Sequence, residues 1–190
     1  MIQCPEKKRI WFPGAMYHIT SRGNRKDTIF HEKDDYIYYL HLLEKSQNRF
    51  PFKLHSYCLM PNHIHLLIET EKHSPSVIIH YIHSLYARYF NHKYRYIGHL
   101  FQNRFDDKII KDWKHMMDTS RYIHLNPVKA GMVKNPEKYP WSSYKTFIAN
   151  YEEPIINSNK IIENLCGGSK KTYKSYVELN LNKGSFYNKL

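Results

Sequence analysis

The sequence predicts an α+β fold in which a four-stranded antiparallel sheet carries two helices on one face. Three observations lead to this prediction. Strand-like and helix-like patterns follow each other in a βαββαβ order over residues 15–111. A Pro61-Asn62 turn joins the two middle strands as a hairpin. Hydrophobic residues make up 42% of the 190 residues, which is enough to bury the core of one ordinary domain.

Alternating and helical periodicities place the individual elements. Strands are expected at residues 15–20, 52–60, 63–69 and 105–111, and helices at residues 34–49, 74–91 and 112–126. Ser74 and Asp112 stand where N-caps are expected, and Pro127 is expected to end the third helix. Because the third helix follows the fourth strand, we expect it to pack on the remaining surface or edge of the sheet.

A domain boundary is expected near residue 150. Residues 150–159 are polar and include Pro154, whereas the segments before them carry core-like patterns. We therefore expect residues 1–150 to form one domain. Residues 151–190 are expected to form a C-terminal extension of unknown role, with two weakly helical stretches after Lys160.

Charge and aromatic content indicate a polyanionic partner. The chain has a net charge of +12, and 15% of its residues are aromatic. Clustered cations gain affinity for phosphates by releasing counterions, and aromatic rings suit stacking on unpaired bases. The plainer alternative is a basic protein without such a partner. No apolar run reaches the 18 residues of a membrane span, and three scattered cysteines fit a reducing compartment, so we expect a cytoplasmic protein with no membrane attachment.

His63 and His65 form the first candidate site. Side chains alternate along a strand, so both imidazoles point to one face, together with Glu69. Two imidazoles on a rigid strand can bind one cation. In a chain with 13 His, the alternative is that they are ordinary core or surface residues.

Tyr122 and Asn126 form the second candidate set. At about 100° per residue, Trp113, Met116 and Met117 share one side of the third helix, which we expect to face the core. Tyr122 then lies on the opposite side, and Asn126 follows it by about one turn. A surface tyrosine is the alternative interpretation. Two imidazoles and an amide oxygen would suit Mg²⁺ or Mn²⁺ holding a phosphate, and Tyr122 could then attack the phosphorus and form a phosphotyrosine.

Several longer motifs resemble the single-tyrosine HUH transposases, and specifically the REP-associated tyrosine transposase branch. The motifs are Met-Pro-Asn-His-Ile-His-Leu-Leu at residues 60–67, Arg-Tyr-Ile-His-Leu-Asn-Pro-Val-Lys-Ala-Gly at 121–131, Tyr-Pro-Trp-Ser-Ser-Tyr at 139–144 and Tyr-His-Ile-Thr-Ser-Arg-Gly-Asn at 17–24. The resemblance spans roughly residues 14–148 and does not inform the tail.

The resemblance implies a ferredoxin-like catalytic domain, with the nucleophile on an additional helix. It assigns metal binding to His63, His65 and Asn126, and the nucleophile to Tyr122. It further implies Mg²⁺- or Mn²⁺-dependent cleavage of single-stranded DNA, often beside a hairpin, that leaves a 5′-phosphotyrosine and a free 3′-OH. The family includes homodimers that exchange the tyrosine helix and also monomers, so the assembly stays open.

Candidate DNA contacts follow from charge and position alone. They are Arg22, Arg25, Lys26, Gln102 and Arg104. The plainer interpretation of each is a polar side chain on the protein surface that contacts only solvent. Glu69 could hydrogen-bond a metal ligand, and its plainer interpretation is an exposed glutamate at the end of the strand.

Two other functions are kept as alternatives. One is a non-catalytic single-stranded nucleic-acid-binding protein of the same fold, a domesticated transposase. The other is a zinc enzyme with His63, His65 and Glu69 as ligands, which would leave Tyr122 and the basic charge unexplained.

Overall fold

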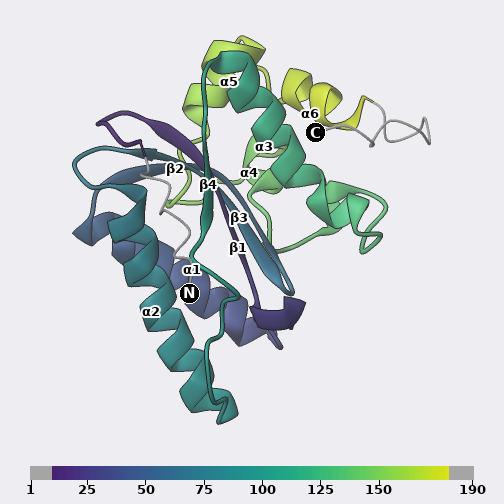
Figure 1. Cartoon of the computed structure of the whole chain (residues 1–190). Coiled ribbons are helices and arrows are strands. Elements are labelled where there is room, and N and C mark those ends of the chain that lie inside the picture. The colour runs from purple at the N-terminus through teal and green to yellow at the C-terminus, as the bar shows by residue number, and fades with distance from the viewer. Residues whose placement is uncertain (1–9, 180–190) are drawn as a thin grey trace, which may run out of the picture.

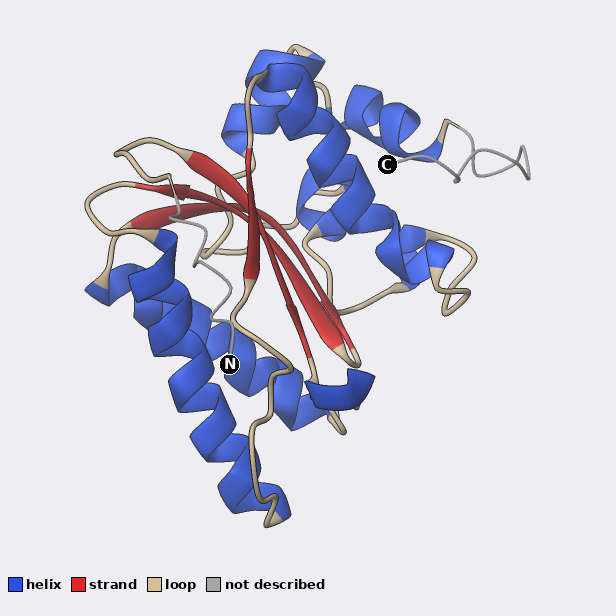
Figure 2. Cartoon of the chain, in the orientation of Figure 1, coloured by secondary structure: helices blue, strands red, loops and turns tan. Residues whose placement is uncertain are grey.

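The fold is an antiparallel sheet with helices on both faces (Figures 1 and 2). The computed structural model describes residues 10–179. The strands are β1 (Met16–Arg22), β2 (Phe52–Met60), β3 (His63–Thr70) and β4 (Asp106–Ile109), in the spatial order β2-β3-β1-β4. Each helical crossover therefore skips one strand, and all neighbours pair antiparallel. This order is ferredoxin-like and confirms the predicted fold class.

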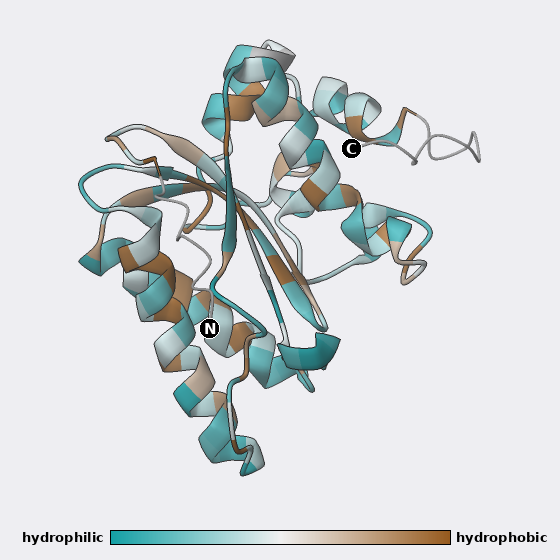
Figure 3. Ribbon diagram, viewed as in Figure 1, coloured by the Kyte–Doolittle hydropathy of each residue, from teal (hydrophilic) through white to brown (hydrophobic). Residues whose placement is uncertain are grey.

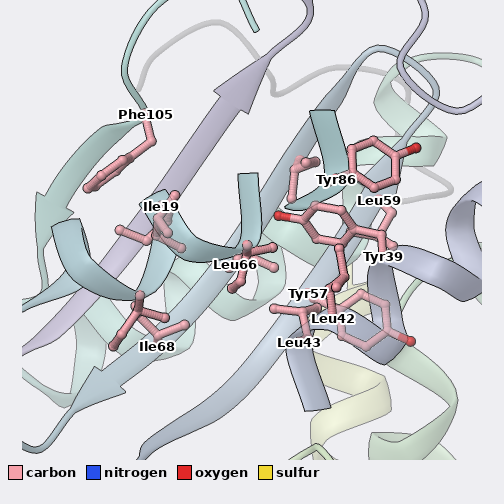
Figure 4. Packing of buried hydrophobic residues seen from close by; sticks show 14 of the residues in the cluster. Ile19, Tyr39, Leu42, Leu43, Tyr57, Leu59, Leu66, Ile68, Tyr86 and Phe105 are labelled. Carbon is pink, nitrogen blue, oxygen red and sulfur yellow. The ribbon is translucent and has the colours of Figure 1, made fainter. Parts of the chain in front are cut away.

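One face of the sheet packs against α1 (Lys33–Arg49) and α2 (Pro75–Tyr94). The strands send alternate side chains to this face, and Ile19, Leu66 and Ile68 are at most 1% exposed there. Tyr39 and Tyr86 pack on them from the two helices (Figure 4). Figure 3 shows hydrophobic residues in the sheet and in the part of α2 that lies against it. Burying these apolar side chains fixes the register of the strands.

The opposite face carries α3 (Trp113–Lys129). Three shorter helices surround α3: α4 (Tyr144–Ile148), α5 (Asn159–Cys166) and α6 (Lys170–Glu178). Cys58, Leu67 and Met116 are fully buried in this second hydrophobic core. The histidine-bearing side of β3 therefore faces the helix that carries Tyr122.

Two details of α3 differ from the predictions. The helix continues to Lys129, so the prediction that Pro127 ends it is wrong. Proline lacks an N–H and removes one helical hydrogen bond, but near the last turn only that bond is lost. Trp113 was expected in the core and is 44% exposed, whereas Met116 is fully buried as expected. The aromatic ring of Trp113 instead lies 5.5 Å from the Lys160 ammonium.

Other boundaries shift by a few residues. β1 extends to Arg22, two residues beyond the predicted end of the first strand. β4 covers only Asp106–Ile109. The loop that follows β1 contains a short 3₁₀ turn, η1 (Asn24–Lys26), and a second one, η2 (Pro136–Lys138), lies between α3 and α4. Asp112 caps α3 by accepting from the His115 N–H, while Ser74 stands at the N-cap of α2 without a side-chain cap bond.

The described part of the C-terminal extension packs on the rest of the chain. Both predicted helical stretches form, as α5 and α6. Tyr173 of α6 is fully buried, and its hydroxyl lies 2.7 Å from Ser120 Oγ and 2.8 Å from His124 Nδ1. The Asn157 N–H donates to the Leu54 carbonyl at the free edge of β2. The division of the chain at residue 150 stays a prediction.

Candidate active site

β3 brings the two predicted histidines onto one face of the sheet. His63 begins the strand directly after the Pro61-Asn62 turn, and His65 follows two positions later. Their ring centroids are 4.9 Å apart, and the rings meet edge to face. His65 is 3% exposed, while His63 lies at the more accessible end of the strand. The pair therefore forms a half-buried donor site that solvent reaches from one end.

A neighbouring amide fixes the tautomer of His63. His63 Nδ1 lies 2.7 Å from Asn62 Oδ1. The Asn62 amide nitrogen donates to the Lys26 carbonyl at 3.0 Å, which fixes the orientation of that amide. An amide oxygen only accepts, so His63 donates from Nδ1 and keeps the lone pair of Nε2.

His18 provides the equivalent partner for His65. It lies on β1, and its Nε2 is 3.1 Å from His65 Nδ1, with the two rings stacked. When His65 donates through this contact, its own Nε2 carries a lone pair. That Nε2 atom is buried and has no hydrogen-bond partner in the described chain. A buried polar atom without a partner is costly, and a bound cation would satisfy it.

Asn126 approaches the histidines from α3. Its amide nitrogen donates to the Tyr122 carbonyl at 2.9 Å, four residues earlier, so its amide oxygen is the atom left to accept or coordinate. The side chain is 8% exposed and faces both His63 and His65. Two imidazole nitrogens and one amide oxygen therefore converge from two elements.

Tyr122 lies beside this set in the same chain. Its ring centroid is 5.5 Å from that of His65 and 5.7 Å from that of His18, edge to face in both cases. The Lys129 ammonium lies 4.3 Å from the Tyr122 ring centroid. The ring quadrupole attracts a cation in this position. The expected juxtaposition of Tyr122 with the histidine pair is thus present within one chain at His65.

Burial keeps the three histidines neutral. It lowers the pKa of His63 to about 4, where the Arg22 charge acts in the same direction and the Asn126 side chain opposes it. Burial also lowers the pKa of His18 to about 4 and that of His65 well below its usual value. Neutral imidazoles are the form that coordinates a metal ion.

These donors fit a divalent cation with open coordination positions better than a closed zinc site. A mixed set of two nitrogens and one oxygen suits Mg²⁺ or Mn²⁺ that also binds a phosphate. Within residues 10–179, no group of three His, Cys, Asp or Glu side chains is arranged to hold a metal. The zinc alternative with Glu69 is therefore contradicted.

Glu69 belongs to a different cluster. Its carboxylate lies 2.9 Å from His55 Nε2 and 2.5 Å from Lys160 Nζ. The His55 contact lowers the pKa of Glu69 to about 2, against the effect of burial and with help from Lys160. Glu69 lies about 13 Å along the extended strand from His65 and about 20 Å from His63, so its interpretation as a partner of a metal ligand is wrong. The alternative of an exposed glutamate is wrong too, because Glu69 is 7% exposed.

The candidate DNA contacts fall into two groups. Arg22 is the register partner of His63, and its charge acts on that imidazole. Arg25 and Lys26 are exposed in η1, next to the Asn62 turn. Gln102 and Arg104 lie in the loop between α2 and β4 and line a hollow beside α2. The Gln102 N–H donates to the Arg22 carbonyl at 2.9 Å, so this loop runs next to the end of β1 that carries the first group.

Three residues near the site were not assigned a role from the sequence. His18, Asn62 and Lys129 all lie within motifs that carried the resemblance. His18 could have been found from strand pairing, since β1 and β3 are neighbours in a ferredoxin-like order. Lys129 follows Tyr122 by seven residues, so helical spacing could have placed both on one side of α3. Across residues 10–179, no helix combines the length and apolar character that a bilayer crossing requires.

The known proteins that this chain resembles are transposases. Residues 12–126 match the model of a family described as "Transposase IS200 like". A Haemophilus influenzae protein, provisionally named a REP-associated tyrosine transposase, is 33% identical over 107 residues. That match covers 50% of this chain and 60% of the relative, so the chain spans less than two thirds of that relative's length.

Two further matches cover more of the chain. The REP-associated tyrosine transposase of Escherichia coli is 25% identical over 154 residues, covering 79% of this chain and 88% of that protein. A solved structure of a REP-associated tyrosine transposase bound to a REP hairpin superposes with a TM-score of 0.66 at 24% identity. It covers 83% of this chain and 93% of that one, and it shares the fold.

Proposed function

Because the chain belongs to the family of IS200-like transposases, we propose that it is a metal-dependent single-stranded DNA endonuclease and strand transferase. In this proposal it cleaves near hairpin or repeat sequences through a 5′-phosphotyrosine intermediate. The observation that carries the proposal is the packing of Tyr122 against His65, with Asn126 one helical turn further on. The related structure bound to a REP hairpin supports a hairpin-containing substrate.

Each side chain has one chemical role in this proposal. His63, His65 and Asn126 would hold Mg²⁺ or Mn²⁺, which supplies charge neutralisation at the phosphate when bound. The Tyr122 hydroxyl oxygen attacks the phosphorus, and the bond from phosphorus to the 3′ oxygen breaks. The 3′ oxygen leaves as a hydroxyl, so the proton lost by the phenol balances the proton gained by the leaving group. Lys129 favours the charge that develops on the phenol oxygen.

Arg22, Arg25 and Lys26 are the proposed backbone contacts beside the metal site. All three lie at the end of the sheet where β3 begins with His63. A DNA strand that places a phosphate at His63 and His65 would pass over this end. Cations at such positions bind phosphates without reading sequence.

We also propose that the site is completed within one chain. The His124 ring connects α3 to two other segments, through Tyr173 of α6 at 2.8 Å and Ser143 at 2.9 Å. All three side chains are buried. Tyr122 lies against His65 of its own chain while this network holds α3 in place, so a monomer with its own Tyr122 in place is the proposed active form.

A covalent-adduct assay tests the proposed activity. The protein is incubated with labelled single-stranded hairpin DNA and Mg²⁺ or Mn²⁺, and the products are separated on a denaturing gel. The proposal predicts an adduct that disappears with Tyr122→Phe and with a chelator, and that persists with Tyr38→Phe on the opposite side of the sheet. Hairpin binding without any adduct would instead support the non-catalytic alternative.

A mixing experiment tests the assembly. His65→Ala and Tyr122→Phe each remove one half of the site. If the site is completed within one chain, a mixture of the two variants stays inactive, and the protein elutes as a monomer in light-scattering chromatography. Recovery of about a quarter or more of the activity in the mixture would show that the helix is exchanged.

A further inference from the structure

The segment that follows β1 packs against the turn that begins β3. Figure 1 shows this segment beside the end of the hairpin formed by β2 and β3. The Gly23 N–H donates to the Asn62 carbonyl at 2.9 Å. The N–H groups of Ile29 and Phe30 both donate to the Pro61 carbonyl, at 2.8 and 3.1 Å. Three backbone hydrogen bonds therefore join this segment to the turn that precedes the first histidine of the metal site.

The first part of the segment is a tightly closed turn of residues 23–27, which we call the η1 turn. The Lys26 N–H donates to the Gly23 carbonyl at 3.0 Å. A Cβ added at Gly23 would overlap the Asp27 carbonyl oxygen and lie 2.8 Å from a methyl group of Ile29. Because glycine alone has no Cβ, it is the residue that fits this close approach of backbone to backbone.

Two residues of the η1 turn have a left-handed backbone. Arg25 has a φ of 52° and Lys26 a φ of 67°. Residues other than glycine rarely adopt positive φ, because the Cβ then crowds the backbone, and those that do are often found at functional sites. Both side chains are exposed, so their burial does not compensate for this conformation. The conformation therefore indicates a role for the backbone itself.

The Lys26 carbonyl determines which end of the Asn62 amide faces the metal site. It accepts from the Asn62 amide nitrogen at 3.0 Å. A carbonyl oxygen only accepts, so the nitrogen end of the amide must face Lys26. The oxygen end then faces His63 Nδ1, at 2.7 Å. The proton of the neutral His63 ring is thereby held on Nδ1, and Nε2 keeps its lone pair.

The opposite orientation of the Asn62 amide would be unfavourable for metal binding. Its nitrogen would face His63 and donate to Nδ1, so the proton of the neutral ring would lie on Nε2. An Nε2 atom that carries a proton has no lone pair to give to a cation. The site would then lose one of its three ligands without any change in the ligands themselves.

We propose that the η1 turn positions the metal site through its backbone. The left-handed conformation of Lys26 aims its carbonyl at Asn62, and Asn62 holds His63 in the tautomer that binds a cation. Gly23 and Lys26 are thus positioning residues. This role is separate from the proposed contact of the Arg25 and Lys26 side chains with DNA. The inference rests on the proposed function, because it concerns the metal ion on which that function depends.

Two substitutions at one position separate the backbone of Lys26 from its charge. Lys26→Gly and Lys26→Pro both remove the cation. Glycine adopts positive φ readily, whereas proline fixes φ near about −65° and removes the N–H that donates to Gly23. Asn62→Ala removes the amide and requires no change in the backbone. Circular dichroism shows whether each variant is folded.

Nitrogen NMR of the protein without metal and DNA reports the tautomer of His63, whose signals are identified by their loss in His63→Ala. We expect the Nδ1–H form in the wild type and in Lys26→Gly, and a shift toward the Nε2–H form in Lys26→Pro and Asn62→Ala. Isothermal titration of Mn²⁺ should show that the last two variants lose about 10–100-fold in affinity. Lys26→Gly should match the wild type.

Two results would overturn the inference. One is an Asn62→Ala variant that keeps the Nδ1–H tautomer and the wild-type affinity for Mn²⁺. The other is an equal loss of affinity in Lys26→Gly and Lys26→Pro, which would assign the effect to the side chain. Neither measurement uses DNA. A wild-type protein with the expected tautomer and Mn²⁺ affinity but without adducts would therefore contradict the proposed function and leave this inference standing.

Discussion

At the scale of single residues, the candidate site depends on which nitrogen each histidine presents. Asn62 accepts from His63 Nδ1, and His18 lies 3.1 Å from His65 Nδ1. Both contacts involve Nδ1, so the Nε2 atom of each of these two histidines is left to bind a cation. Partners of this kind set the orientation and basicity of metal-binding imidazoles, and their loss typically costs 10–100-fold in metal affinity.

His18→Ala should therefore weaken Mn²⁺ binding by about 10–100-fold, because His65 loses the acceptor that fixes its tautomer. Isothermal titration of Mn²⁺ into the DNA-free protein measures this directly. His18→Gln, which restores an acceptor oxygen, should recover part of the affinity, and His41→Ala on the exposed side of α1 should have no effect. Equal Mn²⁺ affinity in wild type and His18→Ala would show that His18 does not position His65.

The sequence was sufficient to bring the principal site residues together, but not to place their neighbours. Strand alternation and helical spacing predicted that His63 and His65 share a face and that Asn126 follows Tyr122 by one turn, and the structure has both. Glu69 obeys the same alternation yet binds Lys160 instead. Side-chain alternation predicts which face of β3 a residue lies on. It does not predict at which point along the strand α3 packs, so it could not distinguish the two histidines from Glu69.

At the scale of elements, α3 is held by the segments that follow it. The Tyr173 hydroxyl of α6 lies 2.7 Å from Ser120 and 2.8 Å from His124, both on α3 and both buried. The other nitrogen of His124 reaches Ser143 at 2.9 Å. The helix that carries Tyr122 is thus positioned by a polar network inside the second hydrophobic core. Networks of this kind specify one packing arrangement when every member is satisfied.

Tyr173→Phe should lower the free energy of unfolding by about 1–3 kcal/mol, because it leaves buried polar groups on His124 and Ser120 without their partner. Urea denaturation followed by circular dichroism measures the change. Tyr176→Phe is the matched control: it removes a hydroxyl that bonds Asp118 at an exposed position on the same helix, so it should cost well under 1 kcal/mol. Equal losses in the two variants would contradict a buried network at Tyr173.

The sequence predicted which segments form strands and which form helices, but it predicted the end residues of these elements less well. The order of strands and helices and the hairpin turn at Pro61-Asn62 followed from periodicity. The ends depend on contacts that periodicity does not encode. Pro127 was expected to stop α3, but the helix is stabilised by burial of Ile123 and Leu125 and tolerates the loss of one backbone bond. Trp113 was expected inside and lies instead beside Lys160, a partner 47 residues away in sequence.

At the scale of the whole molecule, buried histidines couple stability to pH. Burial lowers the pKa of His124 to about 3 and that of His83 to about 3, with the charge of His80 adding to the effect at His83. In the unfolded chain these groups titrate near 6.5. Between about pH 6.5 and pH 3 the unfolded state binds more protons, so the free energy of unfolding falls as the pH is lowered through this window.

Denaturation at several pH values between 7.5 and 4.5 should therefore show progressive destabilisation below about pH 6.5. His124→Gln removes one of the responsible groups, so its stability should depend less steeply on pH than that of the wild type, whatever the substitution costs at pH 7.5. His41→Ala, which changes an exposed histidine, should keep the wild-type slope. An unchanged slope in His124→Gln would show that His124 is not a buried neutral group.

The central claim is that one particular phenol among 17 tyrosines becomes attached to DNA, beside a metal site built by His63, His65 and Asn126. The most direct measurement is mass spectrometry of the digested adduct formed with hairpin DNA and Mn²⁺. We expect a nucleotide on the hydroxyl of Tyr122 and on no other residue, and none when His63 and His65 are replaced by alanine. Attachment at a different tyrosine, or attachment at Tyr122 that persists without both histidines, would contradict it.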